Sequence, residues 1–382
     1  MSPLISLCMI VKDEEANLAR CLDSVRDVVD EIIIVDTGSH DNTVSIARSY
    51  RAKVFYHEWD DNFSAARNVS LDHATGEWIF ILDADEVLAE VSRPALRAAA
   101  EKGDVMGYYV LIQLHPEWTE GRRFCLFRNL LGLRYRGIFH EELSITDDMR
   151  SKFWFSDIKI IHLSWKEEDK KKKLNRNVNL LKKHLLLYPD GVYQILDLIR
   201  IYLESGNISE VEPLLERATT LLAEMESDTH SYRFHLERYF LYLYKLMCLF
   251  KKGLPIERVM PECEQALSLF PSSPLFYYEA AKISYKLKAY DKAISYFQKC
   301  ISLGEDGTWD RVTIFPKDIL GLKSFEGLGY CYFKQRDYDE ALRYFEMSYR
   351  LHEDDRIKTM IHASRTLQTR SAQKDSLPVA GS

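Results

Sequence analysis

The stretch from Gly76 to Glu86 constrains the fold of this chain more than any other part of it. Its apolar run, residues 78–82, is typical of a buried strand, and the run ends in two carboxylates, Asp83 and Asp85. Residues i and i+2 of an extended chain point to the same side, so both carboxylates can converge at the carboxyl end of the strand. Ligands of open α/β sheets bind at that edge, and two hard oxygen donors suit a divalent cation that also takes substrate phosphates as ligands. An Asp-x-Asp by itself remains a weak signal, because acidic turns that cap helices are common.

Earlier segments extend the pattern towards the amino terminus. Residues 5–11 and 31–36 are apolar runs that also end in charged residues, and 53–57 predicts one more strand. The intervening segments predict helices, including one over 44–50 with Ser39 or Asp41 as its N-cap and another over 63–73. The order β-α-β-α-β-α-β favours an α/β domain with a mainly parallel sheet and helices on its faces. The charged residues at the strand ends would then gather along one edge.

Four segments resemble a known family in order and spacing: MIVKDEEANLARCL, EIIIVDTGSHDNT, FSAARN and GEWIFILDADE. They are similar to the nucleotide-sugar domain of family 2 glycosyltransferases, which has the GT-A fold. The similarity is greatest to the branch with C-terminal tetratricopeptide repeats, which includes the sublancin-type peptide S-glycosyltransferases. It covers residues 4–90 strongly and 120–190 more loosely. One departure is Asp13, where the family typically has Asn in Lys-Asn-Glu-Glu.

The resemblance implies site residues in the first half of the chain. Asp85 would hold a divalent metal, Mn²⁺ or Mg²⁺, and Asp83 would hold the ribose or a metal-bound water. Asp36 can accept a hydrogen bond from a uracil ring N–H, while Arg67 and Lys12 can donate to the uracil carbonyls or to phosphate. The first loop, including Glu14, would also contact the UDP-sugar donor. Family analogy makes the reaction inverting, so that no covalent enzyme intermediate is needed.

The segment from 90 to 165 must complete such a site. Residues 122–128 and 135–143 read as strands, the second broken by Gly137, and 157–163 reads as another. In the resembling branch a His-Glu pair and a later strand-borne His occupy these places. Resemblance therefore makes Glu141 the acceptor-activating base and His162 a metal or phosphate ligand, although a histidine like His162 is by itself more often structural. His140 would orient Glu141. The rival bases are Glu142 and, farther along the chain, Asp147.

The second half of the chain is built from helical repeats. Residues 273–307 and 322–355 share one spacing of aromatic and small residues, and 334–342 is a strong tetratricopeptide segment. Weaker copies at 192–224 and 232–271 bring the prediction to four helix pairs, with an insertion at 309–320 between the last two. Such arrays form curved solenoids suited to binding peptides. The alternative is a scaffold that only stabilises the catalytic domain or a homodimer.

We therefore predict a GT-A domain over 1–165, a helical linker over 166–190, an all-α tetratricopeptide solenoid over 191–367 and a disordered tail over 368–382. The linker is rich in lysine, which usually marks a solvated helix face, although Arg176 or Lys173 could approach the leaving diphosphate. The seven cysteines show no C-x-x-C pairing and are expected to be reduced core residues. The amino terminus lacks a basic region, so a signal peptide is not expected.

These features predict a cytoplasmic, metal-dependent, inverting glycosyltransferase that uses a UDP-sugar, with the repeats recruiting a peptide or protein acceptor, for example a ribosomally made precursor peptide. A formal net charge of −7 argues against nucleic-acid binding, and no apolar run is long enough to span a membrane. One alternative acceptor is a saccharide of lipopolysaccharide or capsule assembly. An alternative from another class is a repeat-based interaction protein whose transferase domain is degenerate.

Overall fold

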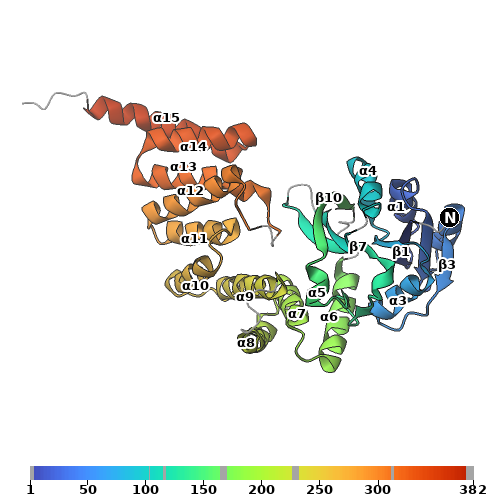
Figure 1. The fold of residues 1–382 in the computed structure, drawn as a ribbon. Coiled ribbons are helices and arrows are strands. Elements are labelled where there is room, and N and C mark those ends of the chain that lie inside the picture. The colour runs from blue at the N-terminus through green and yellow to red at the C-terminus, as the bar shows by residue number, and fades with distance from the viewer. Residues whose placement is uncertain are drawn as a thin grey trace, which may run out of the picture. The chain divides into compact units, whose positions relative to one another are not determined.

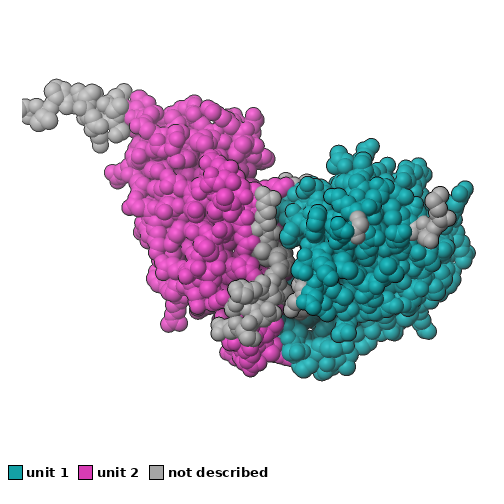
Figure 2. Space-filling model, viewed as in Figure 1, with its two compact units in different colours: residues 1–201 teal, residues 202–382 magenta. Residues whose placement is uncertain are grey.

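The computed structural model describes residues 4–102, 104–114, 118–163, 170–225, 232–310 and 314–375. Two compact units make up the chain, residues 1–201 and 202–382 (Figure 2). The first combines a sheet with helices, and the second is helical in its described part (Figure 1). The predicted fold class, an α/β domain followed by helical repeats, is thus confirmed.

An eight-stranded sheet forms the centre of the first unit, in the order β3-β2-β1-β4-β7-β6-β10-β5. Strands β3, β2, β1 and β4 run parallel, β10 is parallel to β6, and β7 and β5 run antiparallel to their neighbours. Two short strands, β8 and β9, pair separately. The bounds are β1 Ile5–Val11, β2 Glu31–Asp36, β3 Lys53–Tyr56, β4 Trp78–Ile81, β5 Glu86–Leu88, β6 Gly107–Gln113, β7 Gly121–Arg128, β8 Tyr135–Arg136, β9 Glu142–Leu143 and β10 Phe153–His162.

Helices pack on this sheet because the central strands are apolar on both faces. Every residue of β4 is buried, as are the inward residues of α1, including Leu18 and Leu22, which join the same core. The predicted N-cap of α2, Ser39 or Asp41, is wrong, because the N-cap is Asn42. Asp41 nevertheless accepts a hydrogen bond from the Thr43 backbone N–H. The bounds are α1 Leu18–Val25, α2 Thr43–Ser49, α3 Phe63–His73, η1 Glu90–Ser92, α4 Arg93–Ala100, η2 Asn129–Leu131 and α5 Asp147–Arg150.

The predicted linker is a helix, but it packs on the first unit instead of connecting two bodies. Helix α6 covers Lys170–Leu187, and α7 covers Val192–Ser205. On α6 the Lys183 ammonium donates a hydrogen bond to the Asp60 carbonyl at 3.2 Å and lies 3.5 Å from the Asp61 carboxylate. The first unit accordingly ends at Ile201, well beyond the predicted boundary at 165.

Helix pairs fill the second unit, and successive helices from α9 to α15 pack on one another (Figure 1). Helices α7 to α14 cover the segments predicted to form four helix pairs, with the insertion between α12 and α13, although most of α7 lies in the first unit. The pair α13 and α14 approaches closely at Gly329, where a Cβ would lie 2.6 Å from the buried Phe345 ring. The bounds are α8 Ile208–Glu224, α9 Tyr232–Lys251, α10 Ile256–Leu269, α11 Pro274–Lys286, α12 Tyr290–Asp306, η5 Lys317–Leu320, α13 Leu322–Gln335, α14 Tyr338–Leu351 and α15 Asp355–Asp375.

Three further predictions can be compared with the structure. The tail predicted to be disordered from residue 368 is helical up to Asp375, the end of α15, and residues 376–382 lie outside the described part. All seven cysteines are buried and carry free thiols. No helix in the described ranges combines the length and the apolar character needed to cross a membrane.

Candidate active site

The acidic turn after β4 is held in one conformation by its own hydrogen bonds. The Asp83 backbone N–H donates to the Glu86 carboxylate at 3.0 Å, and the Glu86 N–H donates to the Asp83 carbonyl at 3.0 Å. The Asp85 carbonyl accepts from the N–H of Leu163, just beyond the end of β10, at 2.9 Å. These contacts fix the side chains of Asp83 and Asp85 at the carboxyl edge of the parallel strands.

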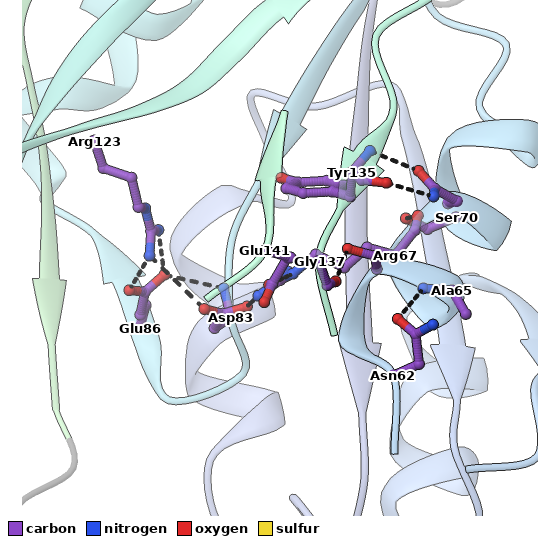
Figure 3. Close-up of polar contacts among 12 residues, drawn as sticks. Asn62, Ala65, Arg67, Ser70, Asp83, Glu86, Arg123, Tyr135, Gly137 and Glu141 are labelled. Atoms are coloured by element: carbon purple, nitrogen blue, oxygen red, sulfur yellow. Dashed lines mark hydrogen bonds and ion pairs between the residues drawn. The ribbon is translucent and has the colours of Figure 1, made fainter. Parts of the chain in front are cut away.

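Arg67 lies between two carboxylates (Figure 3). Its Nη2 is 2.9 Å from the Asp83 carboxylate, and its Nε donates to the Glu141 carboxylate at 2.5 Å. Burial would lower the pKa of Arg67, but the two carboxylates raise it well above its usual value. Burial would likewise raise the pKa of Asp83, but Arg67 and Arg123 lower it. Helix α3, the acidic turn and the loop before β9 therefore meet at one charged centre.

The proposed metal ligands also lie together. The His162 Nε2 is 3.5 Å from the Asp85 carboxylate, and both side chains are about three-quarters buried. Ligand distances of about 2.1 Å to one divalent ion are compatible with this separation. Within the described ranges no group of three or more His, Cys, Asp and Glu side chains is arranged to hold an ion. An ion at this pair would need phosphate oxygens or waters as its other ligands, as Mg²⁺ commonly does.

The predicted nucleotide residues occupy the first two loops at the same edge. Asp36 pairs with Val11 in the β1–β2 register, and its carboxylate accepts hydrogen bonds from the N–H groups of Gly38 and Ser39 at 3.1–3.2 Å. The N–H of Glu14 donates to the Thr43 hydroxyl at 2.7 Å. Lys12 is exposed. A hydrogen bond from the Glu14 backbone N–H thus connects the loop after β1 to the start of α2, which follows the loop after β2.

Asp13, the departure from the family pattern, has a structural role in that junction. Its φ of +54° is left-handed, a conformation that Asn and Asp both adopt more readily than most residues. Its carboxylate accepts from the His40 N–H at 2.7 Å, and its own N–H donates to the Ser39 hydroxyl at 3.0 Å. Aspartate therefore suits this position as asparagine would.

An ion pair that the sequence did not single out supports the acidic turn from β7. Arg123 donates two hydrogen bonds to the Glu86 carboxylate at 2.8 and 2.6 Å, and it lies 3.7 Å from Asp83 (Figure 3). Glu86 is only 1% exposed, and burial raises its pKa although Arg123 opposes the shift. The sequence feature that could have indicated this ion pair is an arginine within a strand that is otherwise largely apolar.

Replacing Arg123 by Met should therefore destabilise the first unit strongly. The Glu86 carboxylate would stay buried without its partner, which typically costs about 3–5 kcal/mol. Arg134→Met is the matched control, because Arg134 and Asp72 form an exposed pair worth less than about 1 kcal/mol. Urea denaturation followed by tryptophan fluorescence measures both. Equal losses of stability in the two variants would contradict this assignment.

The side chain that contacts the Glu141 carboxylate is that of Arg67, whereas the prediction named His140. His140 instead places its Nε2 2.7 Å from the Asp197 carboxylate on α7. Glu142, the rival base, is exposed at the start of β9, and the side chain of Asp147 lies outside the described part. On the basic helix, the Arg176 guanidinium lies 5.8 Å from the centre of the Phe63 ring, and the Lys173 side chain is not described. The structure thus brings together Arg67, Asp83 and Glu141, and separately Asp85 and His162.

Comparisons with known proteins identify the families that the chain resembles. Residues 6–170 match the Glycosyl transferase family 2 model, and residues 275–306 and 323–355 match tetratricopeptide repeat models. A TPR repeat-containing protein of Synechococcus elongatus is 44% identical over 142 residues, 36% of this chain and 34% of that protein. The SPbeta prophage-derived glycosyltransferase SunS of Bacillus subtilis is 28% identical over 198 residues, 50% of this chain and 47% of that protein.

A solved structure, S. aureus TarS 1-349 in complex with UDP-GlcNAc, aligns with a TM-score of 0.37 and 14% identity, covering 66% of this chain and 92% of that one. The chain spans between a third and a half of the length of the two curated relatives. Residues 6–170 therefore form a family 2 glycosyltransferase domain, and the later helices include tetratricopeptide repeats at 275–306 and 323–355.

Proposed function

We propose that this protein transfers a sugar from a UDP-sugar to a side chain of a peptide or protein, with inversion and with the help of a divalent metal. The observation that carries the proposal is the meeting of Asp83, Arg67 and Glu141 beside the pair of Asp85 and His162. In this proposal Asp85 and His162 bind the cation, and Glu141, which Arg67 links to Asp83, takes the acceptor proton. Family 2 membership of residues 6–170 supports the choice of glycosyl transfer.

Asp85 and His162 are the residues that would hold the metal. A divalent ion, when bound, neutralises the charge that develops on the leaving diphosphate. Two protein ligands leave room for phosphate oxygens, which fits the absence of a third acidic or histidine ligand among the described residues. Asp83 is engaged by Arg67 and Arg123, so its contribution is to shape the site and to contact the ribose or a metal-bound water.

Glu141 is the proposed base. It accepts the proton of the acceptor hydroxyl or thiol while that atom attacks the sugar on the face opposite the diphosphate. Arg67 orients the Glu141 carboxylate through a direct charge-assisted hydrogen bond. The same guanidinium contacts Asp83, so Arg67 links the donor side of the site to the acceptor side.

The repeats are the part proposed to recruit the acceptor, as tetratricopeptide arrays suit extended peptides. Similarity to SunS supports a peptide acceptor. The experiment is UDP release from a panel of UDP-sugars, first without acceptor and then with candidate peptides encoded beside the gene. Release without acceptor would exclude a degenerate transferase domain. Stimulation by saccharides and by none of the peptides would contradict the peptide acceptor.

Asp36→Ala tests the nucleotide assignment. The KM for the donor should rise in the variant, because a uracil N–H would lose its acceptor at a cost of about 1–3 kcal/mol, roughly 5- to 150-fold. The preference of the site for UDP over GDP and ADP in competition should weaken in the same variant. Thermal unfolding must be followed in parallel, because the carboxylate also accepts the Gly38 and Ser39 N–H groups. If GDP already competes as well as UDP in the parent, the uracil assignment is wrong.

A further inference from the structure

The loop that carries Glu141 has an unusual backbone. Gly137 has a φ of +86°, and a Cβ there would lie 2.9 Å from the His184 ring. His140 has a φ of +50°, in the left-handed region that is unfavourable for a residue with a side chain. Such a conformation persists only where surrounding contacts hold it. The residue that follows His140 is Glu141, so whatever holds His140 also places Glu141.

Contacts to the start of α3 hold the first half of the loop. The Phe63 N–H donates to the Ile138 carbonyl at 3.0 Å, and the Ser64 hydroxyl donates to the Gly137 carbonyl. These bonds reach the loop before His140. They leave the left-handed residue itself to be held by other groups.

Helix α7 supplies those groups. The His140 Nε2 lies 2.7 Å from the Asp197 carboxylate, and the Tyr193 ring meets the His140 ring edge-on with 5.3 Å between centroids. Tyr193 and Asp197 are four residues apart and share one face of the helix. Arg200 donates two hydrogen bonds to the other oxygen of Asp197, at 2.8 and 2.6 Å. The Asp197 carboxylate is therefore fixed from both sides.

Asp197 has the charge that this role requires. Its side chain is only 10% exposed. Burial alone would raise its pKa, but His140 and Arg200 lower it below the usual value. A buried, ionised and doubly bonded carboxylate orients an imidazole more firmly than a neutral amide can.

We infer that Asp197 is a positioning residue of the transfer reaction: it holds His140 in its left-handed conformation and thereby fixes the Glu141 carboxylate against Arg67. The inference rests on the proposed function, because it takes Glu141 as the base. Asp197 lies beyond residue 170, where the family 2 match ends, on a helix that the sequence pattern assigned to the repeats. The catalytic apparatus thus extends past the segment by which the family is identified.

The test compares Asp197→Asn with Asp190→Asn in the full-length chain. Asp190 is an exposed aspartate in the turn before α7 and serves as the matched control. UDP release from UDP-glucose and UDP-N-acetylglucosamine, with water as acceptor, gives kcat and KM, and calorimetry gives the affinity for UDP with Mn²⁺. In Asp197→Asn we expect kcat to fall about 100-fold, the effect of a misplacement of about 1 Å, with KM and UDP affinity within about twofold of the parent. The control should match the parent.

Hydrogen exchange of the amides of residues 138–143 gives a readout that needs no turnover. Exchange there should be faster in Asp197→Asn and unchanged in Asp190→Asn, with equal melting temperatures showing that the fold is intact. An unchanged kcat, or a loss confined to KM, would overturn the inference. If the parent releases no UDP, the proposed function fails, and the exchange experiment still decides whether Asp197 holds the loop: equal rates in parent and variant would overturn that claim.

Discussion

Asp85→Asn should fold as the parent does and yet lose turnover by about 10²- to 10³-fold, equivalent to the several kcal/mol of charge stabilisation that a catalytic metal supplies. The fold should persist because the backbone hydrogen bond between Leu163 and the Asp85 carbonyl is untouched, and Asn keeps the size of the side chain. Calorimetry should show weaker Mn²⁺- or Mg²⁺-dependent binding of UDP.

Asp72→Asn is a suitable control for that experiment, since Asp72 is an exposed carboxylate on α3 that forms a surface ion pair with Arg134. It should leave both turnover and metal-dependent UDP binding at the parental level. Parental turnover in Asp85→Asn, or full activity of the parent in chelator, would show that no metal at Asp85 takes part.

Glu141→Gln separates chemistry from binding. Gln preserves the size of the side chain and can still accept a hydrogen bond from Arg67, but it cannot take a proton from the acceptor. Glycosylation of the acceptor should fall by about 10²–10⁴-fold, the usual contribution of a positioned general base. Affinity for UDP should change little, because Asp36 and the pair of Asp85 and His162 are untouched. Steady-state transfer and calorimetry on the same preparations test both parts.

Glu142→Gln is the matched comparison, because the neighbouring carboxylate is exposed and is the rival base. It should retain far more activity than Glu141→Gln. Transfer at the parental rate in Glu141→Gln would place the base elsewhere, and Glu142 and Asp147 would be the next residues to replace.

Much of the fold and part of the site follow from local sequence patterns. Strands β1 and β2 begin and end where their apolar runs do, because burial on both faces leaves no polar interruption. Asp85 could be named because it closely follows an apolar strand, and His162 could be named from the family resemblance; the structure places the two side chains 3.5 Å apart. These features depend on short stretches of chain.

The rest depends on contacts that no local pattern encodes. Arg123 meets Glu86 across 37 residues, and His140 meets Asp197 across 57. Each pair joins elements whose order in the sheet, or whose packing on it, must be known before the contact can be foreseen. The domain boundary predicted at 165 likewise rests on local periodicity: the apolar period of α7 is that of a repeat helix, while its Asp197 contacts His140 within the first unit.

Helix α7 lies after the family 2 match but contacts the loop of Glu141, and this matters for building hybrids of this protein with its relatives. A graft joined at residue 170, where the family 2 match ends, would remove Tyr193 and Asp197. A foreign helix without these contacts to His140 would take their place. Gly206, which follows α7 with a φ of +80° and has open space around it, is a better junction. Recombination at that glycine would exchange the repeats proposed to recruit the acceptor, while each hybrid keeps the α7 helix that contacts its own Glu141 loop.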